Sequence, residues 1–143
     1  MGYLIDTNVL SELRKGERRN PHVATWYAAT DQSELFLSVL VVGEVRRGIE
    51  GLARRDPVTS KALDGWLAVV LESFADRILP VTTEIAQRWG RLSAPNPVPI
   101  IDGLLAATAQ IHGHVLVTRN TKDFVGSGTV LLDPFVPPGA SGS

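Results

Sequence analysis

The stretch Tyr-Leu-Ile-Asp-Thr-Asn-Val-Leu-Ser-Glu-Leu at residues 3–13 decides the fold of this chain. Its first three residues are apolar and lead to Asp6, and the residues after Asp6 open with types that cap helices. This order predicts a short buried strand that turns at Asp6 and feeds a helix. The same order recurs at residues 34–51, where a short apolar run precedes Val42, Val45 and Ile49 at helical spacing.

Strands and helices are expected to alternate along the rest of the chain. Three prolines at residues 93–99 require a loop. Alternation of this kind implies right-handed crossovers and an α/β fold with a mainly parallel sheet covered on both faces. We expect one domain at residues 1–136 and a disordered tail at 137–143, which lacks apolar periodicity. Further strands are expected at residues 77–81, 115–118 and 130–132, and further helices at 21–30, 57–74, 100–111 and from Thr82 or Thr83 to about Leu92.

Composition limits the chemistry. The chain has no cysteine, which excludes disulfides and thiolate metal sites and leaves oxygen or imidazole as metal ligands. Its net charge is −1, so any binding of nucleic acid must come from a local patch, such as the arginine doublets at 18–19, 46–47 and 54–55. Solvated helix surface is the alternative interpretation of each doublet. The first residues fit neither a signal peptide nor a membrane span, so a cytoplasmic location is expected.

Four acidic residues follow strands or begin helices. Asp6 follows the first strand, and Asp123 lies shortly after the strand at 115–118, while Glu44 and Asp102 lie early in helices. Both features belong to the carboxyl edge of a parallel sheet, so we expect all four acids to converge. Each acid alone has a plainer explanation, as a helix cap, a surface residue or a turn residue. Glu44 and Asp102, however, stand in strongly apolar segments, where a charge needs compensation.

A cluster of carboxylates predicts a divalent cation. Neighbouring carboxylates repel one another and take up protons, so a cluster that stays ionised at neutral pH needs a cation among them. Oxygen ligands suit Mg²⁺, with Mn²⁺ as the other candidate. A metal held in this way can activate water for attack on a phosphodiester, which predicts a nuclease that needs no protein nucleophile.

At these acids the sequence resembles the PIN-domain family of nucleases, and specifically the VapC toxins of type II toxin–antitoxin pairs. The resemblance is carried by residues 3–13, by Ser-Val-Leu-Val-Val-Gly-Glu-Val-Arg-Arg-Gly at 38–48, by Ile-Ile-Asp-Gly-Leu-Leu-Ala-Ala-Thr-Ala at 100–109, and by Val-Thr-Arg-Asn-Thr-Lys-Asp-Phe at 117–124. It implies a three-layer α/β/α sandwich, with Asp6 and Asp102 as main metal ligands and Glu44 and Asp123 completing the catalytic site. It also implies that Thr7 and Asn8 border the pocket, that Thr118 and Asn120 orient water or the fourth acid, and that Arg46 and Arg47 can meet RNA phosphates.

The resemblance further implies an endoribonuclease that arrests translation and growth, with a transfer RNA or ribosomal RNA loop as the suggested target. Such a toxin is held inactive by a small antitoxin, which places a basic residue in the acidic pocket, where it takes the electrostatic role of the cation. Toxins of this kind usually form homodimers and larger assemblies with the antitoxin, whose DNA-binding domain represses the operon.

Two other functions stay open at this point. A phosphotransfer domain of the receiver or haloacid-dehalogenase kind also places an Asp after its first strand. The haloacid type needs a second Asp where this chain has Asn8, and both types need a pocket Lys, for which only Lys122 is a candidate. Phosphorylation of Asp6 by a small phosphodonor would favour that class. The second alternative is a PIN-fold binding module without activity, which would bind a partner but leave RNA intact.

Overall fold

The computed structural model describes residues 2–139, which form a five-stranded parallel sheet with the strand order β3-β2-β1-β4-β5. The first strand in the chain is central, with Tyr3 in register with Leu35 on one side and with Val115 on the other. The carboxyl ends of β1, β2 and β4 therefore lie next to one another. The strands are β1 (Tyr3–Ile5), β2 (Leu35–Ser38), β3 (Ile78–Leu79), β4 (Val115–Val117) and β5 (Leu131–Leu132).

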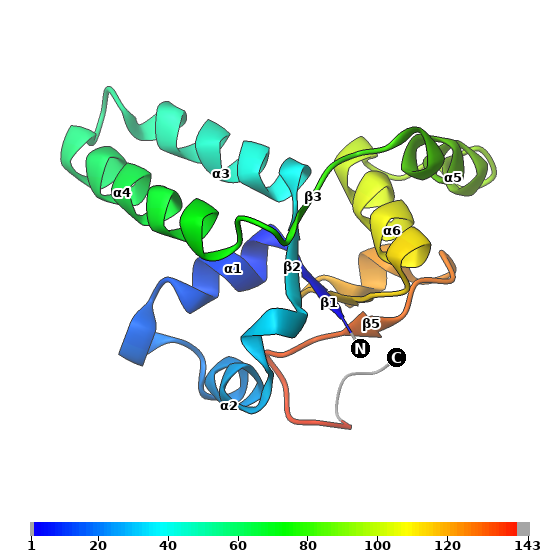
Figure 1. The fold of residues 1–143 in the computed structure, drawn as a ribbon, viewed down its shortest axis with the longest axis horizontal. Helices are drawn as coiled ribbons and strands as arrows, with labels where there is room; N and C mark the ends of the chain where they lie inside the picture. Colours follow the sequence, from blue (N-terminus) through cyan, green and yellow to red (C-terminus); the bar gives the residue numbers. More distant parts are fainter. Residues whose placement is uncertain (1, 140–143) are drawn as a thin grey trace.

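Helices cover both faces of this sheet (Figure 1). Four helices, α1 to α4, lie on one side, and α5 and α6 pack together on the other. Right-handed crossovers require this division, because the chain moves outward from β1 to β3 and then returns across the sheet to β4. The expected three-layer α/β/α fold is confirmed. The helices are α1 (Thr7–Leu13), α2 (Pro21–Ala29), α3 (Val39–Leu52), α4 (Pro57–Ser73), α5 (Thr83–Ser93) and α6 (Ile100–His112).

The helix ends follow local sequence signals. Thr82 caps α5 through a hydrogen bond in which its hydroxyl accepts from the Ile85 amide at 3.2 Å. Pro21 occupies the first turn of α2, where its missing N–H costs nothing. At the end of α6, Gly113 has a φ of 66°, a left-handed conformation that suits glycine. These signals explain why the predicted helix bounds agree with the structure to within one or two residues.

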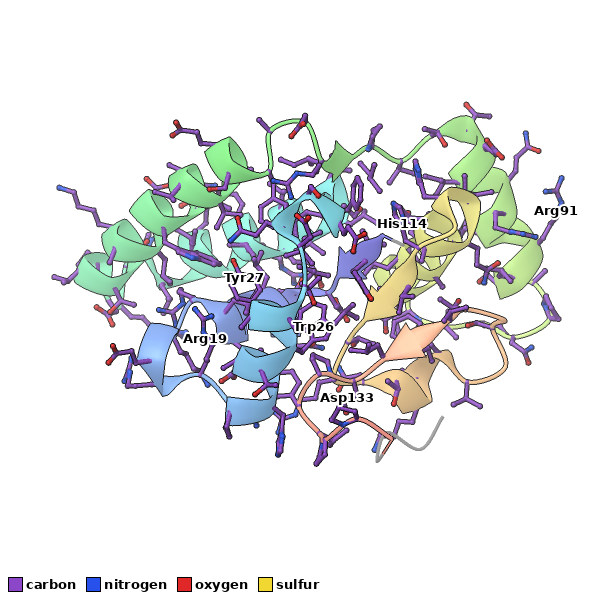
Figure 2. All side chains as sticks on the ribbon, turned by 60° about the horizontal axis from the view of Figure 1, so that its bottom comes forward. Arg19, Trp26, Tyr27, Arg91, His114 and Asp133 are labelled. Carbon is purple, nitrogen blue, oxygen red and sulfur yellow. The ribbon has the colours of Figure 1, made fainter. Side chains whose placement is uncertain are left out.

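The core lies between the sheet and its two helix layers. Leu4 and Ile5 of β1, Leu37 of β2, Leu116 of β4 and Leu105 of α6 are completely buried. Trp26 joins the core from α2 and meets the Tyr3 ring edge-on, with 5.7 Å between ring centroids (Figure 2). A rigid set of short strands thus holds the loops at their carboxyl ends.

Some details differ from the sequence expectations. The third strand is shorter than predicted, and three short 3₁₀ helices, Gly16–Arg18, Gln32–Glu34 and Thr121–Phe124 (η3), were not predicted. Segments of three or four residues are too short to show a helical period. Of the predicted tail, residues 137–139 are exposed, and 140–143 lie outside the described residues. No helix within residues 2–139 has the length and apolar character to cross a membrane.

Candidate active site

Asp6 is fixed at the carboxyl end of β1 by contacts with two neighbouring elements. Its backbone N–H donates to the Val117 carbonyl at 2.9 Å, which continues the pairing with β4. One carboxylate oxygen, Oδ1, accepts from the Thr7 amide at 2.7 Å and caps α1, while Oδ2 accepts from the Thr118 hydroxyl at 2.8 Å. Asp6 is only 7% exposed. The plain explanation as a helix cap therefore holds for Oδ1, and the role of Asp6 in a metal site stays a prediction.

Thr118, directly after β4, is the centre of a small hydrogen-bond network. Its hydroxyl donates to Asp6 and accepts from the Asn8 side chain at 3.3 Å and from the Asn120 amide at 3.1 Å. Asn8 in turn accepts from the Arg119 amide at 3.1 Å. The network ties α1 to the loop after β4. Thr118 thus orients the first acid, Asp6, and makes no hydrogen bond with the fourth acid, Asp123.

Glu44 reaches the same place from α3. Its carboxylate accepts a 2.5 Å hydrogen bond from the Thr7 hydroxyl, and the side chain is half-buried. Hydrogen bonds to a carboxylate are among the stronger ones, so this contact supplies the compensation that the apolar segment around Glu44 requires. It also joins α1 to α3. Thr7 therefore connects Asp6, through its backbone, with Glu44, through its side chain.

Asp102 shows that the four acids share one electrostatic environment. It lies in the first turn of α6, where no side chain caps the helix at Pro99. Burial, followed by the charges of Asp6, Asp123 and Glu44, raises the pKa of the Asp102 carboxyl. All three predicted neighbours therefore act on it. Asp123 itself is exposed, in η3.

The charges of this cluster are not balanced by the protein. In the described part of the chain, none of the four acids forms an ion pair with Lys, Arg or His. Mutual repulsion among unpaired carboxylates is relieved by a cation, and the oxygen donors fit Mg²⁺ or Mn²⁺. Among residues 2–139, however, no three acidic or histidine side chains are already grouped closely enough to hold one metal ion. The donor chemistry fits a divalent cation, and the side chains must close around it.

The arginine doublet of α3, Arg46 and Arg47, follows Glu44 along the same helix. Arg46 pairs with Asp64 of α4 at 2.8 Å, so its guanidinium is engaged between these two helices. Arg47 is exposed and lies three residues after Glu44, which places it on an adjoining face of the helix. Contact of either arginine with RNA stays a prediction.

The structure has a cavity of about 150 Å³ beside Asp102 and Asp123, which the sequence did not predict. It is bounded by Asp102 and Asp123 and by the loop that follows α5. The clearest signal was Gly103, since an added Cβ there would come within 2.8 Å of the Trp89 ring and 3.2 Å of the Val98 side chain. A glycine next to a site acid, in an otherwise apolar helix, indicates a crowded place. It does not by itself reveal an open space beyond.

Comparisons with known proteins agree with this fold. A family model described as PIN domain matches residues 3–125, a range that contains all four acids. The VapC ribonuclease Y4jK of Sinorhizobium fredii is 32% identical over 141 residues, which cover 94% of this chain and 98% of that protein. The crystal structure of FitAcB from Neisseria gonorrhoeae has a TM-score of 0.83 at 28% identity, over 94% of this chain and 99% of that one. A toxin-antitoxin complex from Klebsiella pneumoniae has a TM-score of 0.70, also at 28% identity, over 95% and 100% of the two chains.

These matches extend over nearly the full length of both partners, and they confirm the resemblance drawn from the four sequence segments. The chain belongs to the PIN domain family.

Proposed function

We propose that this chain is a divalent-metal-dependent endoribonuclease and the toxin of a toxin–antitoxin pair. The observation that carries the proposal is that burial, together with the charges of Asp6, Asp123 and Glu44, raises the pKa of the Asp102 carboxyl. The ribonuclease and toxin names of the relatives support it. Unbalanced carboxylates at the carboxyl edge of a parallel sheet suit cation-assisted chemistry on a phosphodiester better than any other reaction considered above.

The chain's own residues supply orientation. When bound, Mg²⁺ or Mn²⁺ supplies the positive charge that offsets negative charge developing on a phosphodiester. The hydroxyls of Thr7 and Thr118 donate to the carboxylates of Glu44 and Asp6 and so restrict the orientation of these two groups. Asn8 and Asn120 hold Thr118 in place. These hydrogen bonds orient two of the four acids in advance, which reduces the part of the reorganisation that falls on Asp6 and Glu44.

Cleavage of total RNA by the purified chain tests the proposal. Mg²⁺ should support cleavage, and a chelator should abolish it. Asp6→Asn should abolish cleavage while the circular dichroism spectrum stays unchanged. Asp76→Asn is the matched control, because Asp76 is 89% exposed, precedes β3 and lies at the opposite edge of the sheet. Cleavage by Asp6→Asn at the rate of Asp76→Asn would contradict the proposal, and phosphorylation of Asp6 by acetyl phosphate would favour the phosphotransfer alternative instead.

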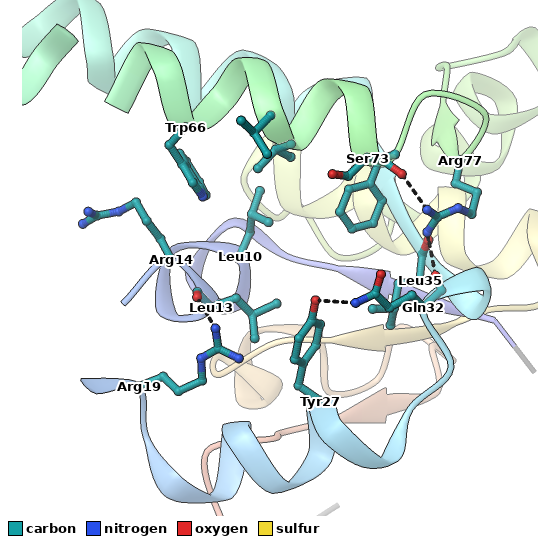
Figure 3. A pocket seen from close by; sticks show the side chains of 13 residues that line it. Leu10, Leu13, Arg14, Arg19, Tyr27, Gln32, Leu35, Trp66, Ser73 and Arg77 are labelled. Carbon is teal, nitrogen blue, oxygen red and sulfur yellow. Dashed lines mark hydrogen bonds between the residues drawn. The ribbon is translucent and has the colours of Figure 1, made fainter. Parts of the chain in front are cut away.

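A groove away from the acids suits a protein partner. It measures about 230 Å³ and lies between α1, α2 and α4, with Leu10, Trp66 and Tyr27 around it and Arg14 and Arg19 at its rim (Figure 3). Apolar walls with basic rims fit a segment that carries apolar and acidic side chains. We assign this groove to an antitoxin, whose basic residue would reach the acidic pocket at the other end of α1. The similar toxin-antitoxin complex from Klebsiella pneumoniae supports an antitoxin partner.

Coexpression with the product of the adjacent gene tests the partner. The complex should block RNA cleavage, and light scattering should show whether the chain is a homodimer alone and in a larger assembly with its partner. Val69→Arg, at a 61% exposed position of the groove, should weaken the complex. Val58→Arg, at an 80% exposed position of the same helix outside the groove, should not. Equal binding by both variants would contradict the assignment of the groove.

A further inference from the structure

The cavity beside Asp102 and Asp123 opens next to the place where a phosphodiester would lie. Two of the four acids form part of its wall, so whatever fills it must also touch the site. Its other walls come from the start of α6, from η3 and from the loop after α5. In Figure 1 these elements lie on the α5–α6 side of the sheet, away from helices α1 to α4.

The volume of the cavity matches one six-membered ring. An apolar cavity of about 150 Å³ in another protein holds benzene, whereas pockets for drug-sized ligands begin at about 300 Å³. This cavity, at about 150 Å³, therefore accepts one six-membered ring and leaves the rest of its ligand outside. In RNA, a pyrimidine base is such a ring.

The walls suit the faces and edges of a base. Val98, Ala106, Phe124 and Val125 provide apolar surface for the faces of a ring. Asn96 lies at the same cavity, and its side-chain amide makes no hydrogen bond with any other described residue. An amide offers one donor and one acceptor to a base edge, which is what reading of an unpaired base requires.

Arg91 lies at the rim of the cavity and supplies a positive charge for the phosphate backbone of the same ligand. Arg91 projects from α5 at the side of the molecule, as Figure 2 shows, and its one hydrogen bond within residues 2–139 is a long one of 3.5 Å to Gln87. A guanidinium that lines the same cavity as Asp102 and Asp123 is available for a phosphate that follows the base, and arginine binds phosphate with two parallel donors.

We propose that this cavity is a base subsite, which takes an unpaired pyrimidine next to the phosphodiester that is cut. Asn96 reads the edge of the base, and Arg91 binds the neighbouring phosphate. The inference rests on the proposed ribonuclease function and deepens it. Since a base in a duplex is stacked and paired, the subsite limits the substrate to single-stranded segments or loops.

Filling the cavity tests the proposal. Ala106 is only 2% exposed and lines the cavity, so Ala106→Leu places a larger apolar side chain in the space. Ala68→Leu makes the same change at an exposed position of α4 and is the matched control. Binding of fluorescent hexamers of uridine and of adenosine is measured by fluorescence polarisation in an Asp6→Asn background, where cleavage should be absent.

Uridine hexamers should bind the background protein more tightly than adenosine hexamers. Ala106→Leu should weaken uridine binding by about tenfold, the size of one lost base contact, and Ala68→Leu should leave it unchanged. Asn96→Ala, in an exposed loop, should remove most of the preference for uridine, and it tests the subsite even if Ala106→Leu does not fold. No preference for uridine, or equal binding by the Ala106→Leu and Ala68→Leu variants, would overturn the proposal.

The two proposals can fail separately. In one case, uridine hexamers bind more tightly than adenosine hexamers, Asn96→Ala removes this preference, and the chain without substitutions does not cleave RNA. That result supports the subsite and contradicts the nuclease function. If RNA is cleaved with Mg²⁺ at positions that Ala106→Leu and Asn96→Ala do not change, the nuclease function is supported and the subsite is overturned.

Discussion

Replacement of Thr118 by Val should destabilise the chain more than its small change in shape suggests. The Thr118 side chain is completely buried, and its hydroxyl makes a 2.8 Å hydrogen bond to the Asp6 carboxylate. A hydrogen bond to a charged group contributes about 1.5–3 kcal/mol, and valine also removes the acceptor of the Asn120 N–H and the nearer of the two acceptors of the Asn8 amide. We therefore expect a loss of about 2–3 kcal/mol in the free energy of unfolding, because valine can neither donate to Asp6 nor accept from its other partners.

The variant Thr118→Ser distinguishes the contribution of the hydrogen bond to stability from that of side-chain packing. Serine keeps the hydroxyl and loses one methyl group, which should cost only about 1 kcal/mol. Urea unfolding of the metal-free variants measures both values, and thermal unfolding should place Thr118→Val about 5–10 °C below the unaltered chain. RNA cleavage should fall in Thr118→Val and persist in Thr118→Ser, because only serine can orient Asp6. If the valine and serine variants had equal stability and activity, the hydrogen bond would have no role and the reasoning would be refuted.

Three further predictions concern other parts of the fold. Gly103→Ala should destabilise the chain by about 1–3 kcal/mol in urea unfolding, because its Cβ would come within 2.8 Å of the Trp89 ring, and a neutral effect would show that Trp89 can move freely. Because the pKa of Asp102 is raised in the folded chain, the stabilisation linked to its protonation is full below the ordinary Asp pKa and is lost as the pH rises through the raised value. Asp102→Asn should therefore raise the Tm of the metal-free chain at neutral pH and leave it unchanged in acid. A lower Tm of Asp102→Asn at neutral pH would show that burial and the neighbouring charges do not destabilise the ionised Asp102 carboxylate. Ser60→Ala should cost about 1–2 kcal/mol, because the buried hydroxyl donates to the Ile49 carbonyl at 3.0 Å and couples α4 to α3, and unchanged unfolding of this variant would show that the contact contributes little.

The sequence predicted the position of Asp6 well because one short segment contains all of the information. An apolar run, an acid and capping residues occur in order within residues 3–13, and the strand and helix follow them directly. The prediction that the acids gather has a similar basis. Parallel strands place their carboxyl ends together, so the position of each acid relative to its strand or helix was enough.

The finer features depend on contacts between distant segments, which a single sequence does not show. Nothing near Thr118 in the chain indicates that its hydroxyl donates to Asp6, 112 residues away. The pairing of Arg46 with Asp64 depends likewise on how α3 and α4 lie against each other. The cavity beside Asp102 is a space left by packing, and such a space has no sequence pattern of its own.

Metal binding tests the central claim most directly. Crystals of the chain are soaked in Mn²⁺, and the anomalous difference map locates the ion. We expect a peak among the carboxylates of Asp6, Glu44, Asp102 and Asp123, with at least Asp6 and Asp102 in direct contact, and no such peak in crystals of Asp6→Asn. An empty site in the unaltered chain at saturating Mn²⁺, or a bound ion only at some other place on the surface, would contradict the account.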